Sequence, residues 1–176
     1  MNDIRFETER LRLRSWRRTD IEPFGRVCNT PAVMHWLGGV QTRRELTTDV
    51  KYFIKTEKAE GHTFWVVERK FDNLFFGFCG VIRILDRDCP AAGKLEIGWR
   101  IREDQWRNGY AFEAAAVTLA DPINRHGGDE IVSRTAAGNV ASQGLMLKLG
   151  MLREQSLTYI PNGEDEALVI YVLPYA

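Results

Sequence analysis

Residues 95–151 decide the fold, and their sequence is LEIGWRIREDQWRNGYAFEAAAVTLADPINRHGGDEIVSRTAAGNVASQGLMLKLGM. Apolar side chains occupy alternate positions from Leu95 to Ile101, which is the periodicity of a strand. Strong helix formers begin at Gly109-Tyr110-Ala111. The first turn of a helix leaves about four backbone N–H groups without intrahelical partners, at the positive end of the helix dipole. Small residues at 109 and 111 let an anion reach these groups, with Arg107 adding charge, although they equally suit tight helix–strand packing.

The second half of this stretch repeats the strand–helix order. Residues 130–136 predict a strand, and residues 140–149 predict a helix that ends at Gly150, in the position of a left-handed C-cap. Asn139 precedes this helix as a good N-cap, and capping alone would explain it. The small-residue loop, helix, strand and capped helix together indicate a coenzyme that is held by its pyrophosphate.

Several segments carry a resemblance to a known family. Residues 106–111 resemble the acetyl-CoA pyrophosphate loop, Gln/Arg-x-x-Gly-x-Gly/Ala, of the GCN5-related N-acetyltransferase (GNAT) superfamily, with Trp106 in place of Gln or Arg. Within it, the chain is most similar to the branch that includes the ribosomal-protein alanine and serine N-acetyltransferases. The segments that look like this branch are residues 7–14, 33–38, 139–143 and 148–151. The resemblance therefore covers residues 8–173.

This resemblance implies an acetyl-CoA-dependent N-acetyltransferase, with acetyl-CoA as cosubstrate and a single domain over residues 1–176. The pattern of elements predicts a mixed α/β fold, with a central, mostly antiparallel, twisted sheet and helices on both faces. We expect the backbone of residues 99–101 to pair with the pantetheine arm as an added strand would, and Asn139 to hydrogen-bond it. The expected acetyl-CoA-binding residues are Trp99, Arg100, Ile101, Trp106, Arg107, Asn108, Gly109, Tyr110, Ala111, Phe112, Asn139 and Ser142.

Two carboxylates are candidates for the catalytic base. Acetyl transfer requires a neutral amine, and a free amine with a pKa of about 10 is mostly protonated at neutral pH. Glu96 lies on the strand beside the coenzyme site, and Glu68 ends the neighbouring predicted strand. Either could accept the proton directly or through water. Each could instead be a strand-end carboxylate that faces solvent or pairs with an arginine.

Ser142 is the candidate for the acid that protonates the departing CoA thiolate. Many members of the superfamily place a tyrosine seven residues after the helix-capping asparagine, and here that position is Met146, which cannot donate a proton. In the branch that this chain resembles, a serine at the position of Ser142 is the usual candidate. The alternative is a helical serine that bonds back to the preceding turn.

Composition argues against several classes of protein, namely nucleic-acid binders, membrane-spanning proteins and metal-binding proteins. The chain carries 24 Lys and Arg against 24 Asp and Glu, and a net charge of zero argues against a dedicated nucleic-acid binder. No apolar run has the length of a membrane span, and no signal-peptide pattern opens the chain. The three cysteines lack C-x-x-C spacing, and the three histidines lack metal-ligand spacing, so we expect a cytoplasmic protein without a metal site.

The sequence does not identify the acceptor amine or the oligomeric state. The acceptor is a small-molecule amine or a protein N-terminus, and its groove is expected to involve residues 34–36. A non-catalytic CoA-binding module is the alternative function, because the tyrosine is missing. We expect a monomer or a homodimer. The strand over residues 167–173 is apolar on both faces, which predicts an interior position in the sheet.

The remaining elements follow from local signals. The capping-box patterns at residues 19–22 and 42–45 predict helix starts, the second helix running to Glu60 before Gly61. Arg10, Arg12 and Arg14 alternate with leucines, which predicts a strand with a solvated basic face. Pro122 is expected to end the coenzyme helix near Ala120. The other predicted strands cover residues 62–70, 74–85, 152–160 and 166–173.

Overall fold

The computed structural model describes residues 3–120 and 130–174. Within these residues, eight strands form one sheet in the order β1-β2-β3-β4-β5-β6-β8-β7. The strands are β1 (Ile4–Glu7), β2 (Leu11–Arg14), β3 (Phe64–Arg69), β4 (Phe75–Arg83), β5 (Leu95–Ile101), β6 (Ile131–Ala136), β7 (Leu152–Tyr159) and β8 (Leu168–Val172). Every neighbouring pair is antiparallel except β5 and β6, which are parallel. The predicted mixed α/β fold with a mostly antiparallel sheet is confirmed.

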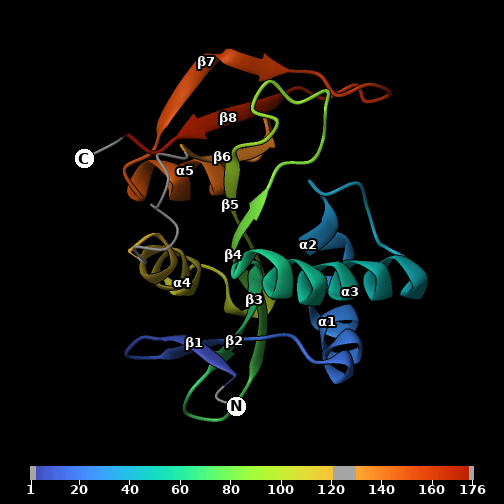
Figure 1. Cartoon of the computed structure of the whole chain (residues 1–176), viewed down its shortest axis with the longest axis vertical. Coiled ribbons are helices and arrows are strands. Elements are labelled where there is room, and N and C mark those ends of the chain that lie inside the picture. Colours follow the sequence, from blue (N-terminus) through green and yellow to red (C-terminus); the bar gives the residue numbers. More distant parts are fainter. Residues whose placement is uncertain (1–2, 121–129, 175–176) are drawn as a thin grey trace.

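Helices cover both faces of this sheet (Figure 1). The helices α1 (Ile21–Cys28), α2 (Pro31–Met34) and α3 (Arg43–Glu60) lie on one face, and α4 (Tyr110–Leu119) and α5 (Val140–Lys148) lie on the other. Successive strand residues point to opposite faces, so Trp65 and Val67 enter the core under α4, while Phe64 and Val66 enter the core under α1 and α3.

The strands β5 and β6 separate after a short paired segment. Their partners are Leu95 with Ile131 and Glu96 with Val132, and the two strands diverge beyond Glu96. This divergence opens the middle of the sheet, and the starts of α4 and α5 both lie beside the opening. The site described below occupies this opening.

Local signals predicted most element ends correctly. Thr42 and Glu45 form the expected capping box, and α3 ends at Gly61 with φ 76°. Gly150 is left-handed, with φ 81°. The helix α4 ends at Leu119, as the position of Pro122 predicted, although Pro122 itself lies outside the described residues.

The strand β8 lies between β6 and β7, so the predicted interior position of the C-terminal strand is also confirmed. None of the helices in the described ranges is long and apolar enough to span a membrane.

The predictions for residues 10–22 were correct only in part. A helix does start within residues 19–22, because α1 begins at Ile21, but Thr19 is not its cap. A 3₁₀ turn spans Arg18–Asp20, and the Asp20 carboxylate accepts the backbone N–H of Arg17. Arg14 is buried rather than solvated, because Asp20 binds its guanidinium through both oxygens at 2.8 Å and Glu68 binds it at 2.6 Å. Asp20 lies beyond the strand and Glu68 lies 54 residues away, so strand periodicity reveals neither contact.

Candidate active site

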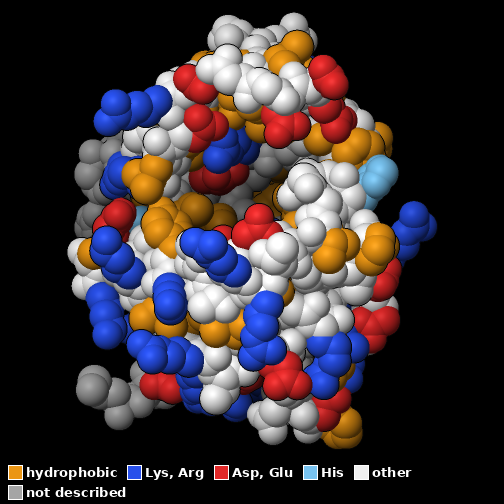
Figure 2. All heavy atoms as spheres, turned by 90° about the vertical axis from the view of Figure 1, so that its right-hand side faces the viewer, with side chains coloured by type: hydrophobic (Ala, Val, Ile, Leu, Met, Phe, Trp, Pro, Cys, Tyr) orange, Lys and Arg blue, Asp and Glu red, His pale blue; other side chains and the backbone are white. Residues whose placement is uncertain are grey.

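A pocket of about 810 Å³ fills the opening between β5 and β6. Figure 2 shows this face of the molecule hollowed, with hydrophobic, acidic and basic side chains around the depression. Its lining comes from the diverging part of β5, the loop before α4, the β6–α5 connection and the α2 region. The site therefore joins segments from both halves of the chain.

The loop before α4 presents a row of backbone donors to this pocket. Arg107 and Gly109 have positive φ angles of 62° and 80°, and α4 begins directly after Gly109. The N–H groups of residues 107–112 make no hydrogen bond with any acceptor in the described part of the chain. Alternating backbone conformations at a helix start create an anion-binding concavity. The site predicted at Gly109 and Ala111 is therefore suited to a pyrophosphate.

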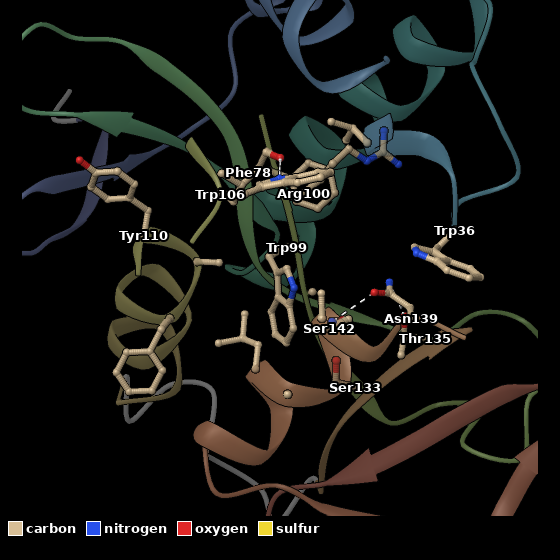
Figure 3. Close-up of a pocket in the computed structure, with 18 of the residues that line it drawn as sticks. Trp36, Phe78, Trp99, Arg100, Trp106, Tyr110, Ser133, Thr135, Asn139 and Ser142 are labelled. Atoms are coloured by element: carbon tan, nitrogen blue, oxygen red, sulfur yellow. Dashed lines mark hydrogen bonds between the residues drawn. The ribbon is translucent and has the colours of Figure 1, made fainter. Parts of the chain in front are cut away.

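Arg10 and Trp106 hold this loop in place. The Arg10 guanidinium donates to the Asn108 carbonyl at 3.1 Å, binds Glu113 of α4 at 2.6 Å and lies 4.3 Å from the centre of the Tyr110 ring. The Trp106 Nε1–H donates to the Ile101 carbonyl at 2.6 Å. The Tyr110 side chain points away from the pocket in Figure 3, so Tyr110 contributes its backbone rather than its ring.

The edge of β5 that faces β6 is the expected docking line for an extended chain. The Ser133 hydroxyl of β6 donates to the Ile97 carbonyl at 2.9 Å, which shows that the backbone groups of Ile97 face β6. Alternate residues of a strand direct their backbone groups to the same edge. The backbone of Trp99 therefore faces the opening, whereas that of Arg100 faces β4 and the Ile101 carbonyl is already bonded to Trp106.

Asn139 and Ser142 lie together on the opposite side of the opening (Figure 3). The Asn139 side chain accepts the backbone N–H of Ser142 at 3.2 Å and donates to the Thr135 hydroxyl at 3.0 Å, so it is an N-cap as predicted. The Ser142 hydroxyl makes no hydrogen bond within the described residues. It does not bond back to the preceding turn, as Thr118 does to the Ala114 carbonyl in α4. Its proton is free for a partner in the pocket.

Met146 does not replace the missing tyrosine at the pocket. Its side chain is fully buried in the core beneath α4 and α5. It is therefore a packing residue.

Glu96 lines the pocket from the face of β5 that is covered by α1 and α3. Both carboxylate oxygens accept from the Arg134 Nε–H, at 3.2 and 3.3 Å, and Arg134 also binds Asp86 at 3.1 Å and the Tyr159 hydroxyl at 2.8 Å. Burial raises the pKa of Glu96 above its ordinary value, even though the Arg134 guanidinium opposes the change. A carboxylate with a raised pKa is a stronger base than an exposed one.

Glu68 is not brought to this pocket. Its carboxylate binds the Arg14 guanidinium in the buried cluster with Asp20, and it does not line the cavity. Both candidate bases pair with an arginine, but only Glu96 lines the pocket; Glu68 and its partner Arg14 do not.

Known proteins share both the sequence pattern and the fold that form this site. Residues 10–152 match the sequence profile of the acetyltransferase (GNAT) domain. The chain belongs to the GNAT family. It is an acyltransferase that uses acetyl-CoA as its donor.

Its relatives include both sequences and solved structures. The chain is 31% identical over 145 residues to the uncharacterized protein YkkB of Bacillus subtilis, covering 82% of this chain and 83% of YkkB. An acetyltransferase (GNAT family) structure from Bacillus anthracis superposes with a TM-score of 0.76 at 24% identity, covering 94% of this chain and 95% of that one. RimL, a ribosomal L7/L12 alpha-N-protein acetyltransferase solved with coenzyme A, has a TM-score of 0.76 at 15% identity, with 96% of each chain covered.

Most residues predicted to form the site of this GNAT domain do line one pocket. Glu96, Ser142 and the predicted acetyl-CoA-binding residues except Asn108 all border it, and Asn108 instead shapes the loop through its bonds to the Gln105 and Trp106 carbonyls. Other lining residues were not predicted from the sequence, and they include Val33, Leu37, Phe64, Phe78, Ile82, Ser133, Arg134, Thr135 and Lys148. Arg134 carried a usable signal, because it is the only charged residue of the strand Ile131–Ala136.

The expected acceptor groove is present only in part. Trp36 lines the pocket and lies on the same side as Asn139 and Thr135 in Figure 3. Its ring packs so close to the β6–α5 connection that a Cβ on Gly138 would lie 2.6 Å from it. Met34 is buried beneath α2, and His35 contacts the Trp36 ring at 4.4 Å without lining the pocket.

Proposed function

We propose that this protein transfers the acetyl group of acetyl-CoA directly to a primary amine, on a small molecule or at a protein N-terminus. The observation that carries the proposal is that Glu96 and Ser142 border the same pocket as the free N–H groups of residues 107–112. A base, a proton donor and an anion-binding loop are the parts that such a transfer needs.

The loop before α4 would bind the pyrophosphate through its backbone donors. Arg107 and Lys148 line the same part of the pocket and add positive charge; Lys148 lies 4.5 Å from the centre of the Phe112 ring. The backbone of Trp99 on β5 and the side chain of Asn139 at α5 would hydrogen-bond the pantetheine arm from its two sides.

Glu96 and Ser142 would carry the proton transfers. Glu96 accepts a proton from the acceptor ammonium, directly or through water, and the neutral amine attacks the acetyl carbonyl carbon. A carbon–nitrogen bond forms, the carbon–sulfur bond breaks, and the CoA thiolate leaves with the electron pair of that bond. The Ser142 hydroxyl supplies a proton to the sulfur and takes up, directly or through water, the proton that the attached nitrogen loses after attack. Glu96 releases its proton to solvent before the next turnover.

A non-catalytic CoA-binding module is the competing proposal. It would need neither a carboxylate with a raised pKa nor a free hydroxyl in the pocket, and both are present at Glu96 and Ser142. Thiol release from acetyl-CoA, measured against a panel of primary amines, separates the two functions. Amine-dependent release supports the transferase; binding of acetyl-CoA with no release for any amine supports the module.

Coenzyme affinity is predicted to depend on the backbone at Gly109. A valine at φ 80° is strained and displaces the loop donors, so Gly109→Val should raise the acetyl-CoA Kd at least tenfold, about 1.4 kcal/mol, by calorimetry. Gly61→Val is the matched control, because Gly61 has φ 76° at the end of α3, outside the pocket. Equal affinity in both folded variants would contradict the loop assignment.

The pH profile is predicted to depend on Arg134. In the folded enzyme the Arg134 guanidinium lowers the pKa of Glu96 against the effect of burial. Arg134→Gln removes that cation, which favours the neutral carboxyl form and raises the pKa of Glu96 further. Activity that requires the carboxylate is lost as pH falls through this pKa, so the acidic limb of kcat/KM should move to higher pH. An acidic limb that stays in place would exclude Glu96 as the titrating base.

A further inference from the structure

Arg100 is a largely buried cation that makes no ion pair with any carboxylate in the described ranges 3–120 and 130–174. It lines the pocket from β5, and its guanidinium lies 5.3 Å from the centres of both the Phe24 and Phe78 rings. Among the described residues, its only side-chain hydrogen bond runs from Nη1 to the Gln41 amide oxygen at 3.2 Å, and the buried Nε has no partner. Asp49 makes no hydrogen bond or ion pair with it; its carboxylate accepts the Gln41 Nε2–H at 2.9 Å and raises the pKa of Arg100, but less than burial lowers it.

The other two arginines in similar surroundings are fully paired. Arg14 binds Asp20 and Glu68, and Arg134 binds Glu96 and Asp86. The pKa values of these two are raised, whereas burial lowers the pKa of Arg100. A buried cation is costly unless an anion compensates it. The contrast indicates that Arg100 meets its anion in the pocket.

The position of Arg100 identifies which ligand supplies the anion. Glu96, Gly98 and Arg100 share one face of β5, the face covered by α1 and α3, because side chains alternate along a strand. The pyrophosphate loop follows the end of β5 and leads into α4, which covers the opposite face of the sheet. Arg100 therefore lies on the same side as the candidate base, where the acceptor amine is deprotonated.

We propose that Arg100 binds a carboxylate of the acceptor, so that the substrate is a primary amine that also carries a carboxylate. This inference rests on the proposed acetyl transfer. The Cα atoms of Glu96 and Arg100 are four strand residues apart, about 13 Å. The amine and the carboxylate are accordingly separated by several bonds, rather than by the single carbon of an α-amino acid.

The walls between these two residues agree with such an acceptor. Phe64, Phe78 and Ile82 line the pocket on this side and suit the aliphatic or peptide segment that joins the two charged ends. The Phe64 ring lies over Gly98, where a Cβ would come within 2.9 Å of it, so the floor of the site is apolar. Polyamines and other polycationic acceptors would place positive charge near Arg100 and are disfavoured.

The first test compares acceptors that differ only in charge. Acetylation of ω-amino carboxylates, from 4-aminobutanoate to 6-aminohexanoate, is measured against the corresponding ω-amino carboxamides. We expect kcat/KM to favour at least one carboxylate over its amide by roughly tenfold to a hundredfold, the range for hydrogen bonds to a charged group. Equal kcat/KM values for every such pair, together with no preference for a carboxylate among the peptides compared below, would overturn the proposal, and this comparison needs no variant to fold.

The second test removes the guanidinium. In Arg100→Gln the ratio of carboxylate to amide kcat/KM should fall toward one, chiefly through a higher acceptor KM. Arg100→Lys keeps the charge without the planar fork and should retain part of the ratio. A ratio unchanged in Arg100→Gln would assign the selectivity to another residue and overturn the proposal. If all amines are acetylated with equal kcat/KM, only the proposed carboxylate recognition is contradicted. If no amine is acetylated, the proposed acetyl transfer itself is contradicted.

A further arm distinguishes the two sources of the carboxylate. Short peptides with a free C-terminus are compared with their amides, and with amidated peptides that carry glutamate at the second or third position. Preference for the ω-amino acids over all of these peptides assigns a small-molecule acceptor. Preference for the glutamate peptides assigns an acidic protein N-terminus. Either result supports recognition of a carboxylate.

Discussion

Glu96→Gln is expected to lower kcat by roughly a hundredfold to ten-thousandfold, the usual contribution of a general base. Glutamine keeps the shape of the side chain and can still accept a hydrogen bond from Arg134, but it cannot take the proton of the acceptor ammonium. Acetyl-CoA affinity by calorimetry should change little, because Glu96 lies away from the pyrophosphate loop. Steady-state kinetics with a saturating amine measures the kcat of the variant and of the unsubstituted enzyme.

Glu68→Gln is the matched control for this prediction. Glu68 makes the same kind of arginine contact as Glu96, but its partner Arg14 lies in the buried cluster outside the pocket. Loss of a charge-assisted bond there should lower the free energy of unfolding by about 1 to 3 kcal/mol. The folded variant should keep its kcat. A large loss of kcat in Glu68→Gln with full activity in Glu96→Gln would reverse the assignment of the base.

Ser142→Ala is expected to lower kcat by roughly tenfold to a few hundredfold. The hydroxyl is the only one on α5 and has no partner in the described residues, so its removal deletes a proton donor without breaking an internal bond. A thiolate whose pKa is near 8.5 leaves tolerably without help, which places the effect at the low end of acid catalysis. Alanine maintains the helix, and the Asn139 cap binds the backbone of residue 142 in either case.

Ser142→Thr is the companion variant, because it keeps a hydroxyl at the same position and should retain most of the rate. Full kcat in Ser142→Ala would leave water as the acid.

We do not expect Met146→Tyr to restore activity in the Ser142→Ala background. Met146 is fully buried in the core, where a larger phenol would be overpacked.

Local periodicity and end signals were enough to place the elements that carry the site. The alternation from Leu95 to Ile101, the small residues before α4 and the Asn139 cap each depend on a few neighbouring residues. Strand alternation, capping and left-handed glycines are short-range effects, so a single sequence contains them. The same patterns, with the family resemblance, brought Glu96 and Ser142 forward as candidates.

The choice between Glu96 and Glu68 required the folded chain. Both are glutamates on strands of the same sheet, Glu68 on β3 and Glu96 on β5, and nothing in their immediate sequence neighbours distinguishes them. Arg14 and Asp20 take Glu68 into an ion-pair cluster, while the separation of β5 from β6 leaves Glu96 beside the pocket. The burial of the Arg100 guanidinium and its hydrogen bonding likewise depend on Phe24 and Gln41, which lie far away in the sequence. Burial and charge pairing are sums over contacts between distant segments, so they exist only once the sheet has assembled.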